Sequence, residues 1–443
     1  MTRRIEDFDE FCDPDNPKIL KYEEVSEASA LINPYIQRVS LLSSHSSKKF
    51  AINLHYKCEN LQRTGSFKER GVINALLHLP LDKKKLGVVV ASLGNEGISM
   101  SYYGAKFNIP VIIVIPTSVQ INYTQRCHSY GAKVLVQGSN LAEAMRYARG
   151  IARDKGLTYI NSRDHPHMLS GYGTLASEIL QEMPSVDAIM VPIGTGGLAA
   201  AVSSVVKHLK PKCLVYGIQP ETTPTFFKML QHSDNEPVLV VNKPTMADST
   251  SVTQIGVNSF AMVQPYLDKM LLVKEEWIAR AMLHMFERQK MVVEGAAACP
   301  LAAILGSLVP ELKMKNVVMV LTGGNVNNLL YSRCLERGLS AEGRLVKFTV
   351  GIQDNTPSQK QLLNLLASGG YDLIHQFQTH KWLDYDEYKL EMCLVCAAKH
   401  LEHALELKRI IDRAYPFNVV FETEPFNDKR TCPCYVYKNI CVY

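Results

Sequence analysis

The feature that most constrains the fold is a series of short apolar runs separated by segments long enough for helices. Between about residues 50 and 325, these runs are Gly87–Ser92, Val111–Ile115, Ala132–Val136, Ala188–Ile193, Leu214–Ile218 and Asn316–Leu321. Continuous apolar strands of this length are buried on both faces, and intervening helices make crossover connections between parallel strands. The sequence therefore predicts an α/β fold with parallel sheets.

The pattern changes after about residue 340, so we expect a second domain with its boundary near Glu342-Gly343. A chain of 443 residues also exceeds the size at which one core usually stops growing. The expected order is strand, helix, two strands, helix and strand, at 345–350, 357–368, 372–378, 388–396, 399–413 and 417–422. This βαββαβ order predicts a ferredoxin-like module.

Composition and charge are those of a soluble globular protein, with 47% apolar and 21% charged residues. The net charge of +5 is dispersed, so we expect no nucleic-acid partner. The longest apolar runs, such as Val111–Ile115, are too short to span a bilayer, so we expect no membrane association. The N-terminus lacks the pattern of a secretory or transit peptide, so we expect a cytoplasmic protein.

The eleven cysteines are scattered, and we expect free thiols. Cys393-x-x-Cys396 lies in an expected strand, and Cys432, Cys434 and Cys441 lie close to the C-terminus. A metal site near the C-terminus is a weaker alternative, because three thiols without a nearby histidine are an incomplete zinc set. We therefore expect no metal.

One lysine lies where a helix is expected to begin. Thr64–Ser66 read as a turn and N-cap, and Phe67 begins the predicted helix. Lys68 then lies in the first turn, where the helix dipole opposes a cation and favours a neutral, nucleophilic amine. On this argument alone, an ordinary exposed lysine is the more frequent outcome.

Three polar loops follow three of the expected strands. They are Ser92-Leu-Gly-Asn95, Gly194-Thr-Gly-Gly197 and Thr322-Gly-Gly-Asn325. Ligands of open α/β folds bind beyond the carboxyl ends of the strands, so these loops are expected to converge on one cleft. Glycine-rich turns that open a helix also present backbone N–H groups to anions, as phosphate or carboxylate sites require.

With these motifs in this order, the chain resembles the threonine and serine dehydratases over about residues 20–340. The segment Lys57–Gly71 resembles their cofactor-lysine segment almost residue for residue. These proteins are fold type II pyridoxal-phosphate enzymes, like tryptophan synthase β, and include serine racemase. The resemblance implies a catalytic domain at 1–340 with a smaller subdomain at about 85–165, an ACT-like regulatory or dimerisation domain at 345–423, and a tail at 424–443. We expect a homo-oligomer.

The resemblance also implies which residues bind the cofactor pyridoxal 5′-phosphate and a small amino-acid substrate. Lys68 is the catalytic residue, which holds the cofactor covalently. The implied cofactor-binding residues are Phe67, Lys68, Asn95, Gly194, Thr195, Gly196, Gly197, Leu198, Glu294 and Thr322. The implied substrate-binding residues are Ser92, Gly94, Asn95 and Glu96. Gln219 stands where relatives usually carry a Glu that can bind a cation, so we do not expect their divalent-cation site in this chain.

Several positions depart from the family pattern. Leu93 stands where relatives have Ala or Ser, and its apolar side chain cannot reprotonate a carbanion. Glu96 stands where relatives have His or Ala, and it would repel a substrate carboxylate unless it points away or is paired. Tyr172 replaces a Gln in the Gly-Gln-Gly-Thr pattern. In the C-terminal module, Asp354–Ser358 replaces an Asp-x-Pro-Gly turn, so effector binding and a simple dimerising sheet both stay open.

The predicted activity is the removal of water and ammonia from L-threonine or L-serine, giving 2-oxobutanoate or pyruvate. Two alternatives stay open. One is a racemase-like activity, against which Leu93 argues. The other is a non-catalytic amino-acid sensor that keeps the cofactor, which Glu96 and the altered turn suggest.

Overall fold

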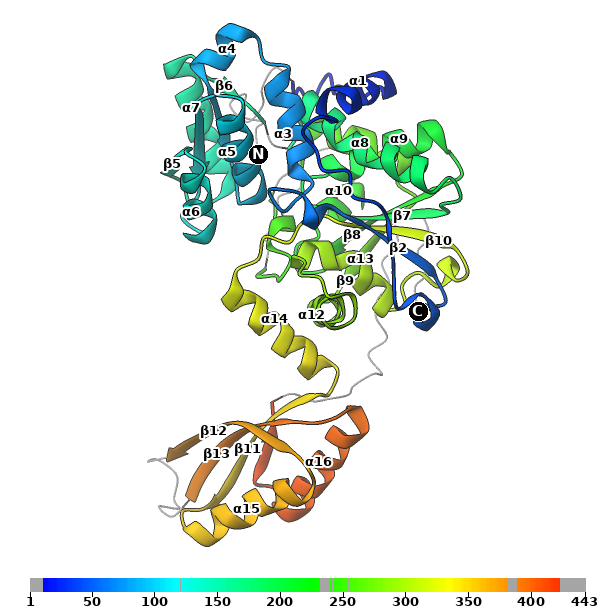
Figure 1. Cartoon of the computed structure of the whole chain (residues 1–443). Helices are drawn as coiled ribbons and strands as arrows, with labels where there is room; N and C mark the ends of the chain where they lie inside the picture. Colours follow the sequence, from blue (N-terminus) through cyan, green and yellow to red (C-terminus); the bar gives the residue numbers. More distant parts are fainter. Residues whose placement is uncertain are drawn as a thin grey trace. The chain divides into compact units, whose positions relative to one another are not determined.

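The computed structural model describes residues 11–119, 121–161, 163–231, 240, 243–253, 255–380 and 389–422. The chain forms two compact units, and the division falls between Leu330 and Tyr331, inside helix α14 (Asn328–Ala341) (Figure 1). The predicted C-terminal tail, with its three cysteines, lies outside the described residues. Within the described residues, no helix combines the length and hydropathy needed to span a bilayer.

The helices of the first unit occur between the strands, as the alternating pattern predicted. The α-helices are α1 (Tyr22–Ile32), α2 (Ser47–Phe50), α3 (Lys68–Leu77), α4 (Leu81–Leu86), α5 (Asn95–Lys106), α6 (Ile121–Ser129), α7 (Leu141–Lys155), α8 (Pro166–Glu182), α9 (Gly197–Leu209), α10 (Thr225–Gln231), α11 (Val257–Tyr266), α12 (Glu275–His284) and α13 (Gly295–Leu305). Short helical turns are η2 (Glu59–Leu61), η3 (Asp248–Thr250), η4 (Met285–Gln289) and η5 (Pro310–Leu312).

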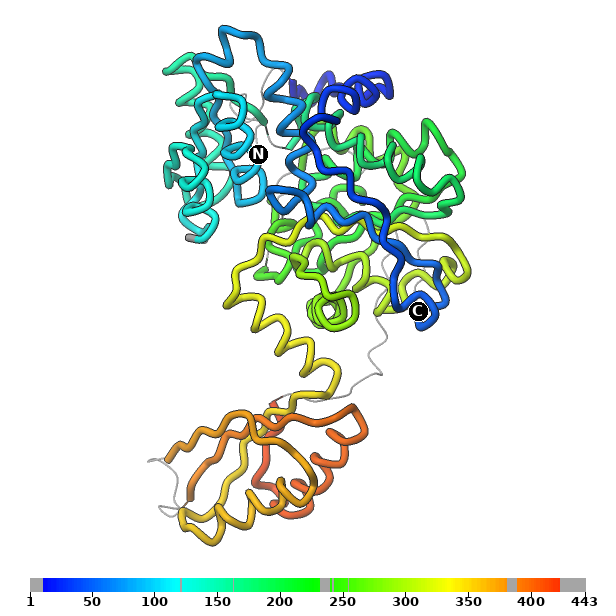
Figure 2. Tube along the Cα trace, viewed as in Figure 1, coloured from blue at the N-terminus to red at the C-terminus, as the bar shows by residue number. Residues whose placement is uncertain are grey.

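The larger sheet of the first unit has the strand order β1-β2-β10-β7-β8-β9, and all its pairs are parallel except β1–β2. Its strands are β1 (Leu42–Ser43), β2 (Asn53–Cys58), β7 (Ala188–Pro192), β8 (Leu214–Pro220), β9 (Lys269–Val273) and β10 (Asn316–Leu321). Figure 2 shows the early strand β2 beside the late strand β10, which pair from Asn53 and Asn316 onward. Helices α9 and α13 pack on opposite faces of this sheet (Figure 1).

The smaller sheet of the first unit is entirely parallel, in the order β5-β4-β3-β6. Its strands are β3 (Val88–Ala91), β4 (Val111–Ile115), β5 (Lys133–Val136) and β6 (Thr158–Tyr159). Val88 and Val90 pack in the core that includes α5, whereas Val89 and Ala91 pack against α7. Burial on both faces is therefore the reason why the β3 sequence is continuously apolar.

The second unit is an antiparallel sheet in the order β12-β13-β11-β14 with two helices, which confirms the predicted βαββαβ order. Its elements are β11 (Leu345–Gln353), α15 (Thr356–Ser368), β12 (Asp372–His380), β13 (Lys389–Ala397), α16 (Leu401–Ala414) and β14 (Val419–Phe421). Every second residue of β11 and β13 is buried against the helices. In the turn Asp354–Ser358, which differs from the family pattern, the Asn355 side chain caps α15 by accepting from the Ser358 N–H at 2.9 Å.

Candidate active site

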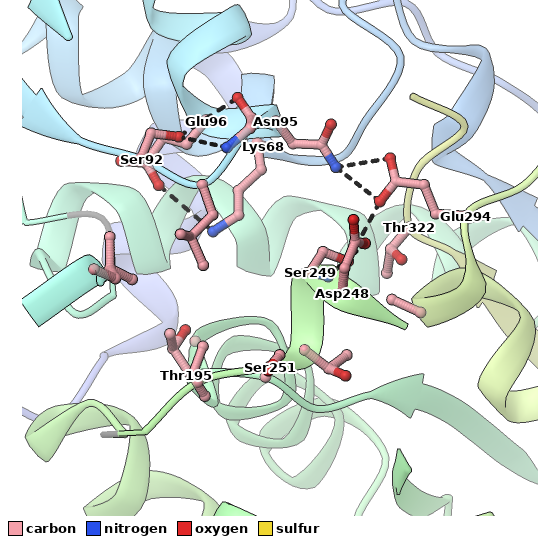
Figure 3. A pocket seen from close by; sticks show the side chains of 18 of the residues that line it. Lys68, Ser92, Asn95, Glu96, Thr195, Asp248, Ser249, Ser251, Glu294 and Thr322 are labelled. Carbon is pink, nitrogen blue, oxygen red and sulfur yellow. Dashed lines mark hydrogen bonds and ion pairs between the residues drawn. The ribbon is translucent and has the colours of Figure 1, made fainter. Parts of the chain in front are cut away.

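A cavity of about 340 Å³ is lined by the loops that follow β3, β7 and β10. Lys68 projects into it between the loop at the start of α5 and the segment around Glu294 (Figure 3). The cavity is lined by every residue that the sequence assigned to catalysis, cofactor or substrate: Phe67, Lys68, Ser92, Gly94, Asn95, Glu96, Gly194, Thr195, Gly196, Gly197, Leu198, Glu294 and Thr322. The expected convergence of the three loops is therefore observed.

The segment before Lys68 is hydrogen-bonded directly to the third loop. The Phe67 N–H donates to the Thr322 carbonyl at 3.0 Å, and the Gly324 N–H donates to the Gly65 carbonyl at 3.0 Å. Helix α3 begins at Lys68, one residue later than predicted, and no side chain caps it. These backbone bonds fix the start of the helix on the loop that follows β10.

Lys68 is surrounded by one carboxylate and two aromatic rings. Its Nζ lies 3.6 Å from Oε2 of Glu96 and 5.3 Å from the ring centroids of both Phe67 and Tyr172. Figure 3 shows the Lys68 and Glu96 side chains directed toward each other. Glu96 therefore points into the cavity and is paired there. This resolves the alternative that the sequence left open.

Two glycines allow α3 and α8 to approach at the level of the backbone. A Cβ on Gly171 would lie 2.5 Å from the Arg70 carbonyl oxygen, and a Cβ on Gly71 would lie 2.6 Å from the Tyr172 ring. Neither position accepts a larger residue without displacement of a helix. The contact fixes the helix that begins with Lys68.

A buried ion network secures the same pair of helices. The Arg70 guanidinium donates to Glu59 at 2.8 Å and to Glu178 at 2.7 Å, and Lys57 donates to Glu178 at 2.5 Å. Burial opposes ionisation of Glu178, but the charges of Arg70 and Lys57 outweigh it and hold the pKa of that carboxyl below its usual range. The network joins β2, η2, α3 and α8 behind the cavity.

The loop after β3 is shaped by its own serine. The Ser92 hydroxyl accepts hydrogen bonds from the N–H groups of Gly94, at 3.1 Å, and Gly97, at 2.9 Å. A Cβ on Gly94 would lie 2.9 Å from the Tyr123 ring, so this position needs glycine. Ser92 therefore holds the turn that opens α5, where first-turn N–H groups have no partner within the helix.

Glu294, the N-cap residue of α13, is the centre of a buried polar cluster. Its carboxylate accepts from the Asn95 side chain at 2.8 and 3.0 Å and from the Ser249 hydroxyl at 3.3 Å (Figure 3). It also accepts from the Asn325 N–H at 2.9 Å. Burial raises the pKa of Glu294 to about 7, and nearby Asp248 adds to the rise, although the Asn95 hydrogen bonds oppose it. This carboxyl can therefore hold or release a proton near neutral pH.

Asn325 is hydrogen-bonded to the segment before α3, to the start of α5 and to α6, although the sequence assigned it no role. Its side-chain amide donates to Asn95 at 2.7 Å and to the Thr64 carbonyl at 2.8 Å. Its carbonyl accepts from the Tyr123 hydroxyl at 2.7 Å, and its side-chain oxygen accepts from Arg126. Asn325 thereby links the third loop to α6 of the smaller sheet.

The loop Gly194–Leu198 leads into the N-terminus of α9 and has glycine at three of its five positions. Gly196 has φ +102°, and a Cβ there would lie 2.7 Å from the Phe226 ring. A Cβ on Gly197 would lie 3.0 Å from the Arg163 carbonyl. Bare backbone at a helix N-terminus is the arrangement that binds a phosphate.

Reasoning from the sequence missed the segment Asp248–Val252, which lines the cavity. Burial raises the pKa of Asp248. The segment lies between α10 and α11, so a search for loops at strand ends could not find it. The available signal was the polar run Asp-Ser-Thr-Ser from 248 to 251.

Gln219 is fully buried in β8. Its side-chain oxygen accepts from the Phe227 N–H at 3.1 Å, so the amide provides an acceptor for an N–H group in the first turn of α10. Across the part of the chain that the structure describes, no group of three or more His, Cys, Asp or Glu side chains could hold a metal ion.

Comparison with known proteins gives the same family. Residues 32–323 match the family described as "Pyridoxal-phosphate dependent enzyme". An L-threonine ammonia-lyase of Thermotoga maritima is 33% identical over 407 residues, which are 91% of this chain and 100% of that protein. Two solved structures, threonine deaminase isoform 2 of Solanum lycopersicum and serine racemase of Dictyostelium discoideum, are 26% and 29% identical, with TM-scores of 0.66 and 0.64. The matches cover 73% and 70% of this chain, and 95% and 99% of those chains. The chain belongs to the family of fold type II pyridoxal-phosphate-dependent enzymes.

Proposed function

We propose that this chain removes water and ammonia from L-threonine or L-serine to give the corresponding 2-oxo acid. The observation that carries the proposal is the convergence of Lys68, the Gly194–Leu198 cradle and the loops at Ser92 and Thr322 on one cavity. The similarity to a threonine ammonia-lyase over 91% of this chain supports the same activity.

The residues present fit pyridoxal phosphate. Gly194–Leu198 offers the phosphate a cradle that a Cβ at Gly196 would distort. Phe67 and Thr322 line the cavity beside Lys68, as residues that contact the ring and its nitrogen must. The Asn95–Glu294 pair, which also lines the cavity, is assigned to the ring edge.

When bound, this cofactor supplies an aldehyde that condenses with amines and a ring that withdraws electrons from the substrate α-carbon. Lys68 would hold the cofactor covalently, and its Nζ would accept the α-proton of the bound substrate. Ser92, Gly94, Asn95 and Glu96 bind the substrate, and the first turn of α5 offers N–H groups to its carboxylate. The Thr322 hydroxyl cannot protonate the ring nitrogen as an Asp would, which favours elimination over transamination.

Leu93 favours elimination over racemisation. Racemisation needs an acid on the face of the α-carbon opposite Lys68, and Leu93 lines the cavity with an apolar side chain. A serine racemase shares the fold at 29% identity, so the product must still be tested for chirality.

The test uses purified holoprotein with L-threonine and with L-serine. We expect 2-oxo acid and ammonia, no D-amino acid, and a visible cofactor absorption that disappears in Lys68→Ala. Turnover should fall in that variant on the order of a thousandfold or more. Lys85→Ala, which changes an exposed lysine, should retain both properties. Bound cofactor without oxo acid from either substrate would favour the amino-acid sensor, and D-serine would favour the racemase.

We also propose that the first 340 residues are the catalytic domain, with the smaller subdomain at about 85–165, and that the second unit is an ACT-like regulatory or dimerisation module. The βαββαβ order and the relative that matches 91% of the chain support this division. The homo-oligomeric state and the cytoplasmic location stay predictions of the sequence.

A further inference from the structure

Two residues beside Lys68 distinguish this cavity from the pattern that its loops otherwise follow. By the resemblance described from the sequence, Glu96 stands where the dehydratase pattern has His or Ala, and Tyr172 stands where it has Gln. Both line the cavity and are almost fully buried, with 4% and 1% of their surface exposed. The carboxylate of Glu96 and the phenol of Tyr172 therefore both lie beside the amine of Lys68.

Glu96 lies beside the reactive nitrogen of Lys68. Its Oε2 is 3.6 Å from the Nζ of Lys68 (Figure 3). With pyridoxal phosphate held by Lys68, a substrate amine would have to approach the region of this Nζ, because it would replace the lysine nitrogen there. An amino acid brings that nitrogen as an ammonium, so the Glu96 carboxylate faces a positive charge at this point.

Tyr172 carries a hydrogen-bond donor that no described residue accepts from. Its hydroxyl is buried and has no hydrogen-bond partner among the described residues. Burial, and then the charge of Glu96, raise the pKa of Tyr172 well above its usual value, so the phenol stays a donor. A buried donor without a partner is costly, and a ligand that accepts from it removes that cost.

The other ionisable groups of the cavity also favour zwitterionic amino acids over monoanionic carboxylic acids. Asp248 and Glu294 also line it, so among the described residues three carboxyl groups and one lysine face the ligand space. A monoanionic acid would bring a further negative charge to this wall. A zwitterion brings an ammonium with its carboxylate and compensates Glu96.

We propose that Glu96 and Tyr172 form a subsite that selects zwitterionic amino acids, in which Glu96 binds the α-ammonium and Tyr172 donates to the α-carboxylate. The inference rests on the proposed function, since it describes how the same cavity recognises its substrate. It also explains why the Glu96 side chain does not repel the substrate α-carboxylate that the same loop binds. Glu96 contacts the α-ammonium of the substrate instead. Simple carboxylic acids are rejected.

Two probes of matched shape test this selection. N,N-dimethylglycine and 3-methylbutanoate carry the same carboxylate and nearly the same volume, but only the first has a cationic nitrogen. Neither has a primary amine, so neither condenses with the cofactor. Their affinities for the holoprotein are measured by competition with L-alanine, whose binding is read from the cofactor absorption.

We expect the unmodified protein to bind N,N-dimethylglycine about tenfold more tightly than 3-methylbutanoate, consistent with one partly screened charge pair. In Glu96→Gln, the two affinities should become similar, mainly because 3-methylbutanoate binds better. The matched control is Glu276→Gln, because Glu276 is also the second residue of its helix but is exposed. It should keep the tenfold difference.

Tyr172→Phe tests the other half of the subsite. Both probes carry a carboxylate, so both should bind roughly tenfold more weakly, with their ratio unchanged. Equal affinities for the two probes in the unmodified protein would overturn the inference without any variant. A ratio that persists in Glu96→Gln, or unchanged affinities in Tyr172→Phe, would overturn the role of that residue. The measurement needs bound cofactor but no turnover, so its outcome is independent of the dehydratase assay.

Discussion

The side-chain amide of Asn95, which is partly buried, donates to both carboxylate oxygens of the buried Glu294, at 2.8 and 3.0 Å. The two residues are 199 positions apart and belong to the loops that open α5 and α13. Their contact joins the smaller sheet to the larger one across the cavity. Burial raises the pKa of Glu294 to about 7, so this joint is sensitive to pH.

The first prediction concerns stability and pH. Because its pKa is raised from 4.5 to about 7 in the folded state, the stability that Glu294 contributes is full below about pH 4.5 and is lost as the pH rises through about 7. Glu294→Gln cannot titrate, so between pH 5 and 8 the apoprotein should lose less stability than the unmodified chain, by up to about 3 kcal/mol. Denaturant unfolding at both pH values measures this, and identical pH dependence in both proteins would contradict it.

The second prediction concerns the phosphate cradle. Gly196→Ala forces a side chain onto φ +102° and within 2.7 Å of Phe226. The free energy of unfolding should fall by about 1–3 kcal/mol, and pyridoxal phosphate should bind at least about tenfold more weakly. Gly150→Ala in α7 meets nothing within 4 Å and should instead stabilise by about 0.5–1 kcal/mol, with cofactor affinity intact. Chemical unfolding and cofactor titration decide, and similar effects of the two variants would argue against a shaped cradle.

The third prediction concerns the buried ion network. Arg70→Met leaves Glu59 and Glu178 buried without their guanidinium partner, with only Lys57 still bound to Glu178. The expected loss of stability is about 3–5 kcal/mol. The control is Arg409→Met, which removes an exposed pair on α16 and should cost about 0.5 kcal/mol or less. A small loss in Arg70→Met would mean that the network does not hold α3 in place.

The fourth prediction separates a cap from a substrate contact. Ser92→Ala removes the acceptor for two N–H groups at the start of α5, and Asn140→Ala removes the acceptor for the Glu143 N–H in α7. Each should cost about 1 kcal/mol of stability. Only Ser92→Ala should also raise the KM for the amino acid, because its turn borders the cavity. A raised KM in both variants would indicate a general loss of stability instead.

Much of the fold was predictable because burial on both faces leaves a clear pattern. The runs at Val111–Ile115 and Asn316–Leu321 are observed as strands with those bounds, and the βαββαβ module follows its predicted order. Strands β2 and β9 were not predicted. In the β2 sequence, Asn-Leu-His-Tyr-Lys-Cys, the apolar residues are interrupted by His55 and Lys57. The charge of Lys57 is compensated by Glu178, which lies 121 positions further along the chain.

The site was predictable where a loop follows a strand, and less so elsewhere. All assigned site residues line one cavity, but Asp248 and Asn325 gained their importance only from the fold. The orientation of Glu96 was equally hidden in the sequence, because a carboxylate can point toward or away from a helix start. Its direction depends on Lys68, which another helix brings to within 3.6 Å.

The close crossing of α3 and α8 has a consequence for how this cavity can change. Where Gly71 and Gly171 meet, two main chains touch with no room for one additional methyl group. The position of the backbone from which Lys68 reaches into the cavity is thus set in part by the close approach of two main chains. Exchanges at positions such as Glu96 or Tyr172 can alter which molecule is accepted, while the point of chemical attack stays where it is.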